Sequence, residues 1–179
     1  MVDALTLEQL QDARSGNATA FGALIGPLLH PAYQLAVGML QDATEAEDVV
    51  QEACLAAWRK LGQLRAATSL RPWFLAIVAS RCRRARRSRW LSVIKQADPV
   101  ATGTDAEDPS ATVAADLRLA CRRLAHDELL VLTLHYCLDL PLDEVGTTLG
   151  ISREAAKSRL YRAVRKLRPM LEDPEEVDR

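Results

Sequence analysis

The chain has 179 residues, 49% of them hydrophobic and 26% charged, a composition that suits one or two small domains able to bury a core. Aromatic residues make up only 4%, and alanine and leucine dominate the apolar residues, so helices are favoured over sheets. The net charge of −1 is the sum of +3 over residues 1–90, −4 over 91–116 and 0 over 117–179, which indicates separate surfaces for separate partners.

Several protein classes are disfavoured at the outset. No apolar run approaches the roughly 20 residues of a membrane helix, and the N-terminus lacks the basic start and apolar stretch of a secretory signal. The four cysteines contain no CxxC pair, which argues against a disulfide scaffold or a cysteine-rich zinc module. We therefore expect a cytoplasmic protein without direct membrane insertion.

Hydrophobic residues recur at helical spacing in several segments between residues 3 and 90. Pro31 separates two of these stripes, which predicts two helices there, and Gly62 ends a third. Pro72 opens a further helix, on which Trp73, Ile77 and Ser80 share a face. The first three stripes consist of Phe21, Leu24, Ile25, Leu28 and Leu29; Tyr33, Ala36, Val37 and Leu40; and Val49, Val50, Ala53, Cys54, Ala57, Trp58 and Leu61. Together they predict a helical bundle.

An arginine cluster and an acidic segment follow the bundle. Residues 80–90, SRCRRARRSRW, hold six arginines with no acid between them: Arg81, Arg83, Arg84, Arg86, Arg87 and Arg89. Planar guanidinium groups fit phosphate and guanine, so this segment predicts nucleic-acid binding; a solvated helix end is the alternative. Residues 97–114 carry two Asp-Pro pairs and acids without bases, which predicts a flexible acidic linker.

A second helical domain is predicted from about residue 115 to 171, with residues 131–140 in a helix. Its segment LPLDEVGTTLGISREAAKSRLYRAVRKLR has the pattern of a helix-turn-helix. Gly146 permits close approach of the two helices, Gly150 takes the left-handed conformation of the turn, and Ser152 caps the second helix. The inner faces consist of Leu142, Val145 and Leu149, and of Ala156, Leu160, Val164 and Leu167, with Ile151 at the corner.

The second helix of this motif exposes a basic face. That face consists of Arg153, Lys157, Ser158, Tyr161, Arg162 and Arg165. Residues 153–168 hold seven bases and one acid, which suits a helix lying among the phosphates of a major groove. A charged, solvated helix in an ordinary bundle is the alternative interpretation. No catalytic set of residues emerges, because the histidines, His30, His126 and His135, are scattered; we expect no enzyme activity, cofactor or metal site.

Both halves of the chain resemble a known family, the extracytoplasmic-function sigma factors of bacterial RNA polymerase. GNATAFGALI, AEDVVQEACLAAWRKL and LRPWFLAIVASRCRR resemble the family's second conserved region, and ELLVLTLHYCLDLPLDEVGTTLGISREAAKSRLYRAVRKLR resembles its fourth. The resemblance implies an all-α fold of two small helical domains, residues 1–92 and 115–179, joined by a linker over 93–114. It also implies an activity, promoter recognition and opening, in answer to a stress or envelope signal.

The resemblance implies three binding surfaces. Core polymerase would meet Asp48, Gln51, Glu52 and Leu55 through the clamp helices of its largest subunit, and the flap of its second-largest subunit is a further expected partner. The −10 promoter element would meet Gln63, Arg65, Thr68, Ser69, Arg71, Ser80, Arg81, Arg84 and Arg87. The −35 element would meet Arg153, Lys157, Ser158, Tyr161, Arg162 and Arg165. An anti-sigma factor is a further expected partner.

The residues alone do not exclude one alternative: a free-standing helix-turn-helix regulator that binds duplex DNA as a dimer. A purely protein-binding helical adaptor is a third reading, which predicts no salt-sensitive affinity for DNA. The identity of the promoter sequence, the inducing signal and the surface for an anti-sigma factor do not follow from the sequence.

Overall fold

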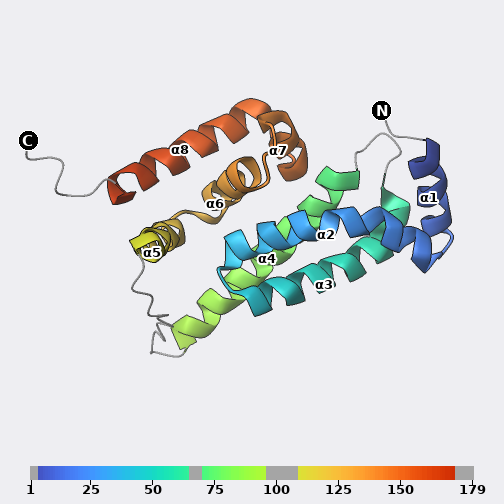
Figure 1. Ribbon diagram of the computed structural model, residues 1–179, viewed down its shortest axis with the longest axis horizontal. Helices are drawn as coiled ribbons and strands as arrows, with labels where there is room; N and C mark the ends of the chain where they lie inside the picture. Colours follow the sequence, from blue (N-terminus) through green and yellow to red (C-terminus); the bar gives the residue numbers. More distant parts are fainter. Residues whose placement is uncertain (1–3, 65–69, 96–108, 172–179) are drawn as a thin grey trace, which may run out of the picture.

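The computed structural model describes residues 4–64, 70–95 and 109–171, and every regular element within these ranges is a helix (Figure 1). The predicted all-α fold of two helical domains is confirmed. The first half consists of α1 (Ala4–Arg14), α2 (Ala18–Leu40), α3 (Ala43–Lys60), the short 3₁₀ helix η1 (Leu61–Gln63) and α4 (Leu70–Lys95). The second half consists of α5 (Pro109–Arg122), α6 (His126–Leu132), the π-helical turn η2 (Thr133–Cys137), α7 (Leu142–Leu149) and α8 (Arg153–Leu171).

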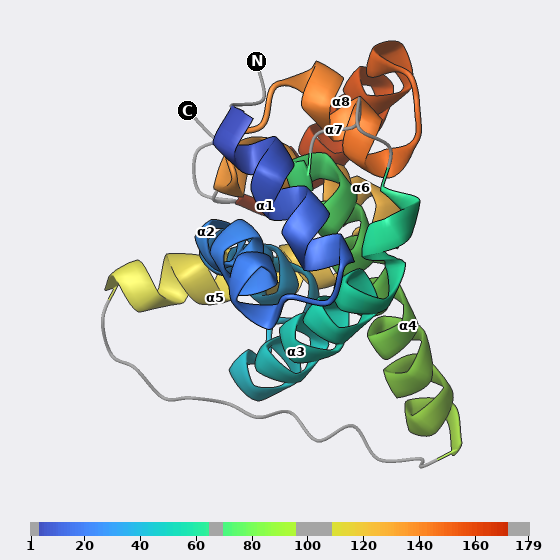
Figure 2. The ribbon, with the colours of Figure 1, turned by 90° about the vertical axis from the view of Figure 1, so that its right-hand side faces the viewer.

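The first half is a bundle in which α2, α3 and α4 pack pairwise and α1 lies against the start of α2 (Figure 2). Side chains cap two of these helices at their N-termini. Asn17 accepts hydrogen bonds from the backbone N–H groups of Thr19 and Ala20, and Asp42 accepts one from that of Glu45 at 2.9 Å. These caps satisfy backbone donors that the first helical turn leaves without an intrahelical partner, so they fix where α2 and α3 begin.

The prediction that Pro31 separates two helices is wrong. α2 runs without interruption from Ala18 to Leu40 and contains both Pro27 and Pro31. Each proline lacks an N–H, so it leaves one carbonyl of the preceding turn without a partner. Pro27 is exposed and Pro31 half-buried, so these carbonyls lie on the side of the helix away from the core, where water can satisfy them. Burial of Ile25, Leu35 and their neighbours on the opposite side stabilises the helix through both prolines.

The expectation that no apolar segment approaches the length of a membrane helix also needs correction, because α2 is such a segment. Among the described residues, α2 is a helix long and apolar enough to cross a membrane, judged by length and composition alone. In the structure its apolar side instead packs against α3 and α4. Its fully buried residues, Ala32, Leu35 and Ala36, belong to the hydrophobic core. In this structure the long apolar segment is therefore a core helix of the bundle.

The core face of α4 differs from the predicted one. The helix begins at Leu70, so Pro72 lies within the first turn, where a missing N–H is tolerated. Trp73 and Ile77 are half-buried and Ser80 is exposed, so the predicted face lies at the edge of the core. The side chains at its centre are Phe74, Leu75, Val78, Ala79 and Cys82, all buried. α4 is covered on two sides, by the bundle and by α7, which explains why more than one stripe is buried.

The predicted helix-turn-helix is confirmed as α7, a turn and α8. Gly150 has φ of 66°, the left-handed conformation that glycine adopts without strain. A Cβ on Gly146 would lie 2.8 Å from the carbonyl oxygen of Ile151, so only glycine permits this close approach. The hydroxyl of Ser152 accepts a hydrogen bond from the N–H of Ala155 at 3.1 Å, which caps α8 as predicted. Ala163, rather than Val164, is the fully buried residue of the last turns of α8.

Two boundaries in the second half differ from expectation. α5 begins at Pro109, so the last six residues of the segment predicted as linker, 109–114, are helical. Proline is favoured at the first position of a helix, because its N–H would have no partner there and its φ is already suitable. Residues 131–140 are helical as predicted only to Cys137, where the π-helical turn η2 ends. The rest of the predicted linker, 97–108, lies outside the described residues.

The two halves pack against each other and share one hydrophobic core. α2 contacts α6 and η2, and α4 contacts α7 (Figures 1 and 2). The continuous core cluster includes Leu35 and Met39 of α2 together with Leu130, Leu134 and Val145 of the second half. A smaller cluster lies between α1, α2 and η1. The sequence analysis predicts two domains but not this packing.

Candidate polymerase and nucleic-acid interfaces

The four predicted polymerase-binding residues lie together on the exposed face of α3. Asp48, Gln51, Glu52 and Leu55 are all exposed, whereas Ala46, Val49, Val50, Ala53, Ala56 and Ala57 on the opposite side are buried. The apolar side chain of Leu55 is 58% exposed in the midst of these polar residues. An exposed leucine alone is unremarkable, but it lies beside a larger apolar surface.

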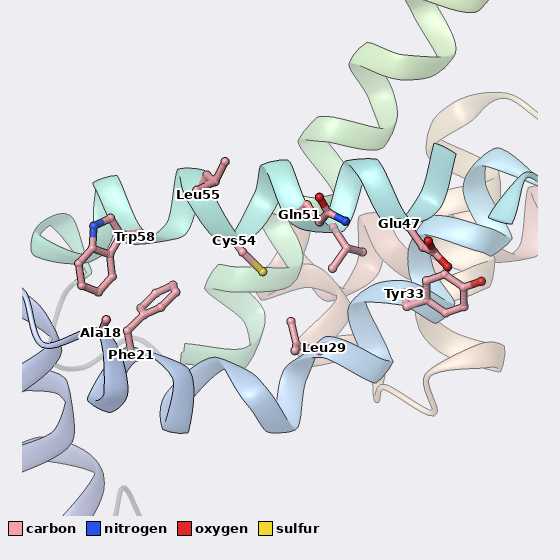
Figure 3. Close-up of a pocket in the computed structure, with 10 residues that line it drawn as sticks. Ala18, Phe21, Leu29, Tyr33, Glu47, Gln51, Cys54, Leu55 and Trp58 are labelled. Atoms are coloured by element: carbon pink, nitrogen blue, oxygen red, sulfur yellow. The ribbon is translucent and has the colours of Figure 1, made fainter. Parts of the chain in front are cut away.

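That surface is an apolar groove of about 820 Å³ between α2 and α3 (Figure 3). Leu55 and Gln51 line it from α3, and Leu29, which is 41% exposed, lines it from α2. Phe21 and Trp58 meet edge to face at one end, with ring centroids 5.0 Å apart. Leu29 and Trp58 were predicted as core residues. The sequence could have indicated the groove residues only through the width of each apolar stripe. A stripe wider than the face that the core buries leaves some of its residues exposed.

The other edge of the α3 face meets the arginines of α4. Nη1 of Arg81 lies 3.0 Å from a carboxylate oxygen of Glu52, and a polar cleft of about 270 Å³ contains both. Asp48 and Arg84 line the same cleft. A predicted polymerase contact and a predicted DNA contact are therefore ion-paired in this structure. Because the Glu52 side chain is 63% exposed, water screens the pair and its contribution to stability is small.

The predicted −10 residues are only partly brought together. Ser80, Arg84 and Arg87 are exposed on α4, and Arg81 is half-buried in its ion pair with Glu52. Gln63 is exposed at the end of η1. The remaining predicted contacts of the preceding loop, Arg65, Thr68 and Ser69, lie outside the described residues.

Arg71 is placed differently from the other predicted −10 residues. It is half-buried at the start of α4, and its Nη2 donates a hydrogen bond to the carbonyl oxygen of Leu138 at 3.4 Å. Leu138 belongs to the second half of the chain, just after η2. Arg71 is therefore engaged between the halves rather than turned toward solvent.

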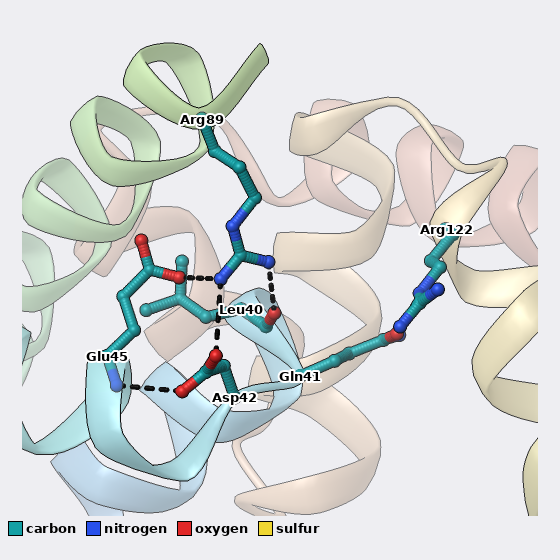
Figure 4. Close-up of polar contacts among 6 residues, drawn as sticks. All are labelled: Leu40, Gln41, Asp42, Glu45, Arg89 and Arg122. Atoms are coloured by element: carbon teal, nitrogen blue, oxygen red, sulfur yellow. Dashed lines mark hydrogen bonds and ion pairs between the residues drawn. The ribbon is translucent and has the colours of Figure 1, made fainter. Parts of the chain in front are cut away.

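Two other arginines of the cluster, Arg89 and Arg83, make internal contacts, and a third, Arg86, is partly buried. Arg89 donates to the carbonyl oxygen of Leu40 and forms ion pairs with Asp42 and Glu45, which ties the end of α4 to the α2–α3 turn (Figure 4). Arg83 pairs with Asp127 of the second half at 3.2 Å. Arg86 is half-buried, and desolvation lowers the pKa of its guanidinium. Part of the arginine cluster thus organises the fold, which the charge pattern alone does not reveal.

The predicted −35 residues form one exposed face of α8. Arg153, Lys157, Ser158, Tyr161, Arg162 and Arg165 are all exposed, as predicted. Nζ of Lys157 lies 5.7 Å from the centroid of the Tyr161 ring, a cation–π distance, and Nε of Arg162 donates to the carbonyl oxygen of Ser158 at 3.3 Å. These contacts hold the side chains along the helix without burying them. The face can therefore supply hydrogen-bond donors to a groove.

A buried carboxylate anchors α8 to α6. Glu128 is 6% exposed; its two carboxylate oxygens each lie 2.8 Å from Nζ of Lys166, and one accepts from the N–H of Ala125. The hydrogen bond from Lys166 holds the pKa of Glu128 below its usual value. This pair fixes the orientation of the basic helix. The sequence pattern does not distinguish Lys166 from the exposed bases around it.

We predict that His126 lowers the stability of the folded protein in acid. Burial, with Arg83 and Arg86 nearby, lowers the pKa of His126 to about 4 although Asp127 opposes the shift. Neutral His126 is therefore favoured in the folded state, and the unfolded chain binds its proton from about pH 6.5 downward. We expect the thermal midpoint to fall between pH 6.5 and 4 and to fall less in His126→Gln. Thermal unfolding across that range tests this; parallel curves for the two proteins contradict it.

No group of three histidine, cysteine or acidic side chains that could hold a metal is found among the described residues. Burial raises the pKa of Cys82 to about 12, and Cys54 borders the apolar groove. These thiols are poor nucleophiles at neutral pH.

Comparison with known families divides the chain in the same way. The family described as Sigma-70 region 2 matches residues 24–92, and Sigma-70, region 4 matches residues 121–169. The first match covers α2 to α4, with the α3 face and the arginine cluster. The second covers α6 to α8, with the helix-turn-helix.

Individual proteins agree with these matches. The chain is 32% identical over 170 residues to the ECF RNA polymerase sigma factor SigL of Mycobacterium tuberculosis, and the alignment covers 89% of this chain and 95% of SigL. It is 28% identical over 172 residues to the probable RNA polymerase sigma factor RfaY of Xanthomonas campestris, covering 90% of this chain but only 43% of RfaY. Among solved structures, CnrH in complex with the cytosolic domain of CnrY has a TM-score of 0.70 at 27% identity, covering 96% of this chain and 99% of CnrH.

Proposed function

This chain belongs to the extracytoplasmic-function (ECF) family of RNA polymerase sigma factors, and on that basis we propose that three of its surfaces bind different partners during promoter recognition. The exposed face of α3 binds core polymerase, the loop before α4 and the arginines of α4 bind and open the −10 element, and α8 reads the −35 element. The observation that carries the proposal is that two separate basic surfaces, on α4 and α8, occur in the two matched regions, together with a polar–apolar face on α3.

The α3 face is suited to a protein partner. Residues 42–52 hold five acids and no base, which repels DNA and favours a basic protein surface. Leu55 and the apolar groove beside it supply surface whose burial favours association. We propose the clamp helices of the largest polymerase subunit as the partner of this face, and the flap of the second-largest subunit as the partner of the C-terminal domain.

In this proposal, the protein opens the DNA strands by binding alone, without an enzymatic step. Binding the opened non-template strand more tightly than the duplex shifts the population toward the melted state. The arginines of α4 supply phosphate contacts for that strand. The protein therefore acts in the cytoplasm, with the polymerase, and catalyses no reaction itself. A regulator of the anti-sigma type is a further proposed partner, since CnrH was solved with the cytosolic domain of a second protein.

In vitro transcription with purified core polymerase tests the proposal. The chain should direct initiation at discrete start sites on a genomic library, and the chain alone should not shift promoter DNA. A free-standing helix-turn-helix regulator predicts the reverse, a stable complex with duplex DNA in the absence of polymerase. Start sites that are no different with and without the chain contradict the proposal.

A paired substitution on α8 tests base reading against phosphate binding. Arg162 lies on the exposed face one turn beyond Ser158, from where its guanidinium can reach a guanine edge, a contact worth about 1–3 kcal/mol of discrimination. Arg165, nearer the C-terminal end, is the expected phosphate contact. Arg162→Ala should relax preference at one or two −35 positions, and Arg165→Ala should weaken all promoters about equally. Transcription from single-base −35 variants distinguishes them; a uniform loss in both assigns base reading to Lys157, Ser158 or Tyr161.

A further inference from the structure

The helix α1 lies at the end of the bundle where α3 passes into η1 (Figure 1). It precedes residues 24–92, which match Sigma-70 region 2, so it lies outside the matched region. Leu10 and Ala13 of α1 form a small hydrophobic cluster with Leu61 and Leu64, and all four residues are 9% exposed or less. The end of α1 is therefore packed against the short segment that leads out of α3.

The short helix η1 places Gln63 on the outside of that cluster. A 3₁₀ helix has about three residues per turn, so residues three apart share a face. Leu61 and Leu64 share the buried face, which leaves Gly62 and Gln63 exposed. The carbonyl oxygen of Leu61 accepts a hydrogen bond from the N–H of Leu64 at 3.2 Å. The direction in which Gln63 points therefore depends on how the backbone on either side of it is held.

Arg14, the last residue of α1, holds that backbone on both sides of Gln63. Its Nε donates a hydrogen bond to the carbonyl oxygen of Leu61 at 3.4 Å, and its Nη2 donates one to the carbonyl oxygen of Leu64. The last carbonyl groups of a helix have no intrahelical partner, and a cation is favourable beside them. One guanidinium group thus fixes a carbonyl group before Gln63 and another after it.

The exposed amide of Gln63 is suited to reading a base. It has two N–H donors and an acceptor oxygen, and a pair of amide hydrogen bonds to a base edge discriminates between bases. Such contacts need side chains held within about 0.5 Å of the productive geometry. A helix of only three residues, Leu61–Gln63, has few hydrogen bonds of its own to supply that restraint. The contacts from α1 supply it from outside.

We propose that Arg14 is a positioning residue for −10 recognition: by holding the carbonyl groups of Leu61 and Leu64, it aims the amide of Gln63 at one base of the −10 element. The inference rests on the proposed function, in which Gln63 contacts that element. Arg14 acts through Gln63 and does not itself touch DNA. The helix α1 then belongs to the −10 site, although it lies outside the residues matched to Sigma-70 region 2.

A double-mutant cycle tests this inference. The measurement is transcription with core polymerase from single-base −10 variants, each relative to the parent promoter. Arg14→Ala and Gln63→Ala should each lower the preference at the same −10 position by about fivefold. The double variant should lose no more than either single variant, because the two side chains act as one unit. Arg59→Ala removes an exposed cation from the last turn of α3, and as the matched control it should keep the parental preference.

Two further measurements separate positioning from a direct charge contact and from a loss of folding. A phosphate contact by Arg14 would make Arg14→Ala lower the slope of log affinity against log salt by about 1, whereas positioning leaves the slope unchanged. Arg14→Lys keeps the charge and most of the side-chain packing but lacks the planar fork that reaches both carbonyl groups. It should lose the −10 preference as Arg14→Ala does, with a thermal midpoint close to that of the parent.

The results that would overturn the proposal are distinct from failure of the proposed function. A uniform loss at all promoters, additive effects in the double variant, a reduced salt slope, or parental preference in Arg14→Lys each overturns the role of Arg14. An unchanged −10 preference in Gln63→Ala does the same while the parent still initiates transcription. Failure of the parent protein to direct initiation by core polymerase instead overturns the proposed function.

Discussion

Leu55→Asp is expected to weaken assembly with core polymerase by about thirtyfold while leaving the fold intact. Leu55 is 58% exposed and lines the apolar groove between α2 and α3, so a carboxylate there would be desolvated by any partner that covers the groove. Substitutions at the centre of an interface cost about 2 kcal/mol or more, which is roughly thirtyfold in affinity. Fluorescence anisotropy with labelled chain and purified core polymerase measures the change.

Leu119→Asp is the matched control for this substitution. Leu119 lies on α5 in the other half of the chain and is 55% exposed, so the same change of charge occurs at nearly the same exposure. Surface substitutions of this kind usually change stability by less than about 0.5 kcal/mol, and both variants should keep the thermal midpoint of the parent. Equal loss of polymerase binding in the two variants, or none in Leu55→Asp, contradicts the assignment of the α3 face.

The helix-turn-helix is the part of the site that follows most directly from the sequence. Gly146, Gly150 and Ser152 each have a local backbone role, and the structure confirms all three. The exposed face of α8 follows from helical periodicity once the turn is placed. These features depend on residues close together in the chain, so propensity and spacing suffice.

The contacts between distant segments could not be predicted in the same way. The pairing of Glu52 with Arg81, and of Asp127 with Arg83 and Arg159, depends on how α3, α4, α6 and α8 pack. A charge pattern along one helix shows which side chains carry charge but not which partner neutralises them. The arginine cluster therefore appeared uniform, whereas Arg89 holds the α2–α3 turn and Arg84 remains exposed.

The packing of the two halves was missed for a related reason. Gly38 has no turn or positive φ to mark it, and its role, a close approach of α2 to η2, becomes visible only beside Thr133, 95 residues away in the chain. Pro31 is the opposite case, in which the sequence predicts a feature that the structure lacks. The rule that proline interrupts a helix predicts a break there, but burial of the surrounding apolar residues keeps α2 continuous. Local rules thus predict elements and turns, and tertiary packing determines which surfaces remain open to partners.

Replacing the arginines of α4 should impair promoter opening by more than tenfold. Arg81, Arg84 and Arg87 follow one another at i, i+3 spacing; no ion pair of Arg84 or Arg87 is found among the described residues, and Arg81 must release Glu52 to bind DNA. The Arg81→Ala, Arg84→Ala, Arg87→Ala variant loses up to three phosphate contacts, so the slope of log affinity against log salt should fall by about 2 to 3. Open-complex formation on duplex promoters measures the loss, and a template with a pre-opened bubble should recover part of it because unpairing then costs the protein nothing. Arg123→Ala, which removes an exposed cation from the turn after α5, is the control and should behave as the parent. If duplex and bubble templates show equal defects, the three arginines contribute general phosphate binding, and strand opening depends on the residues that precede α4.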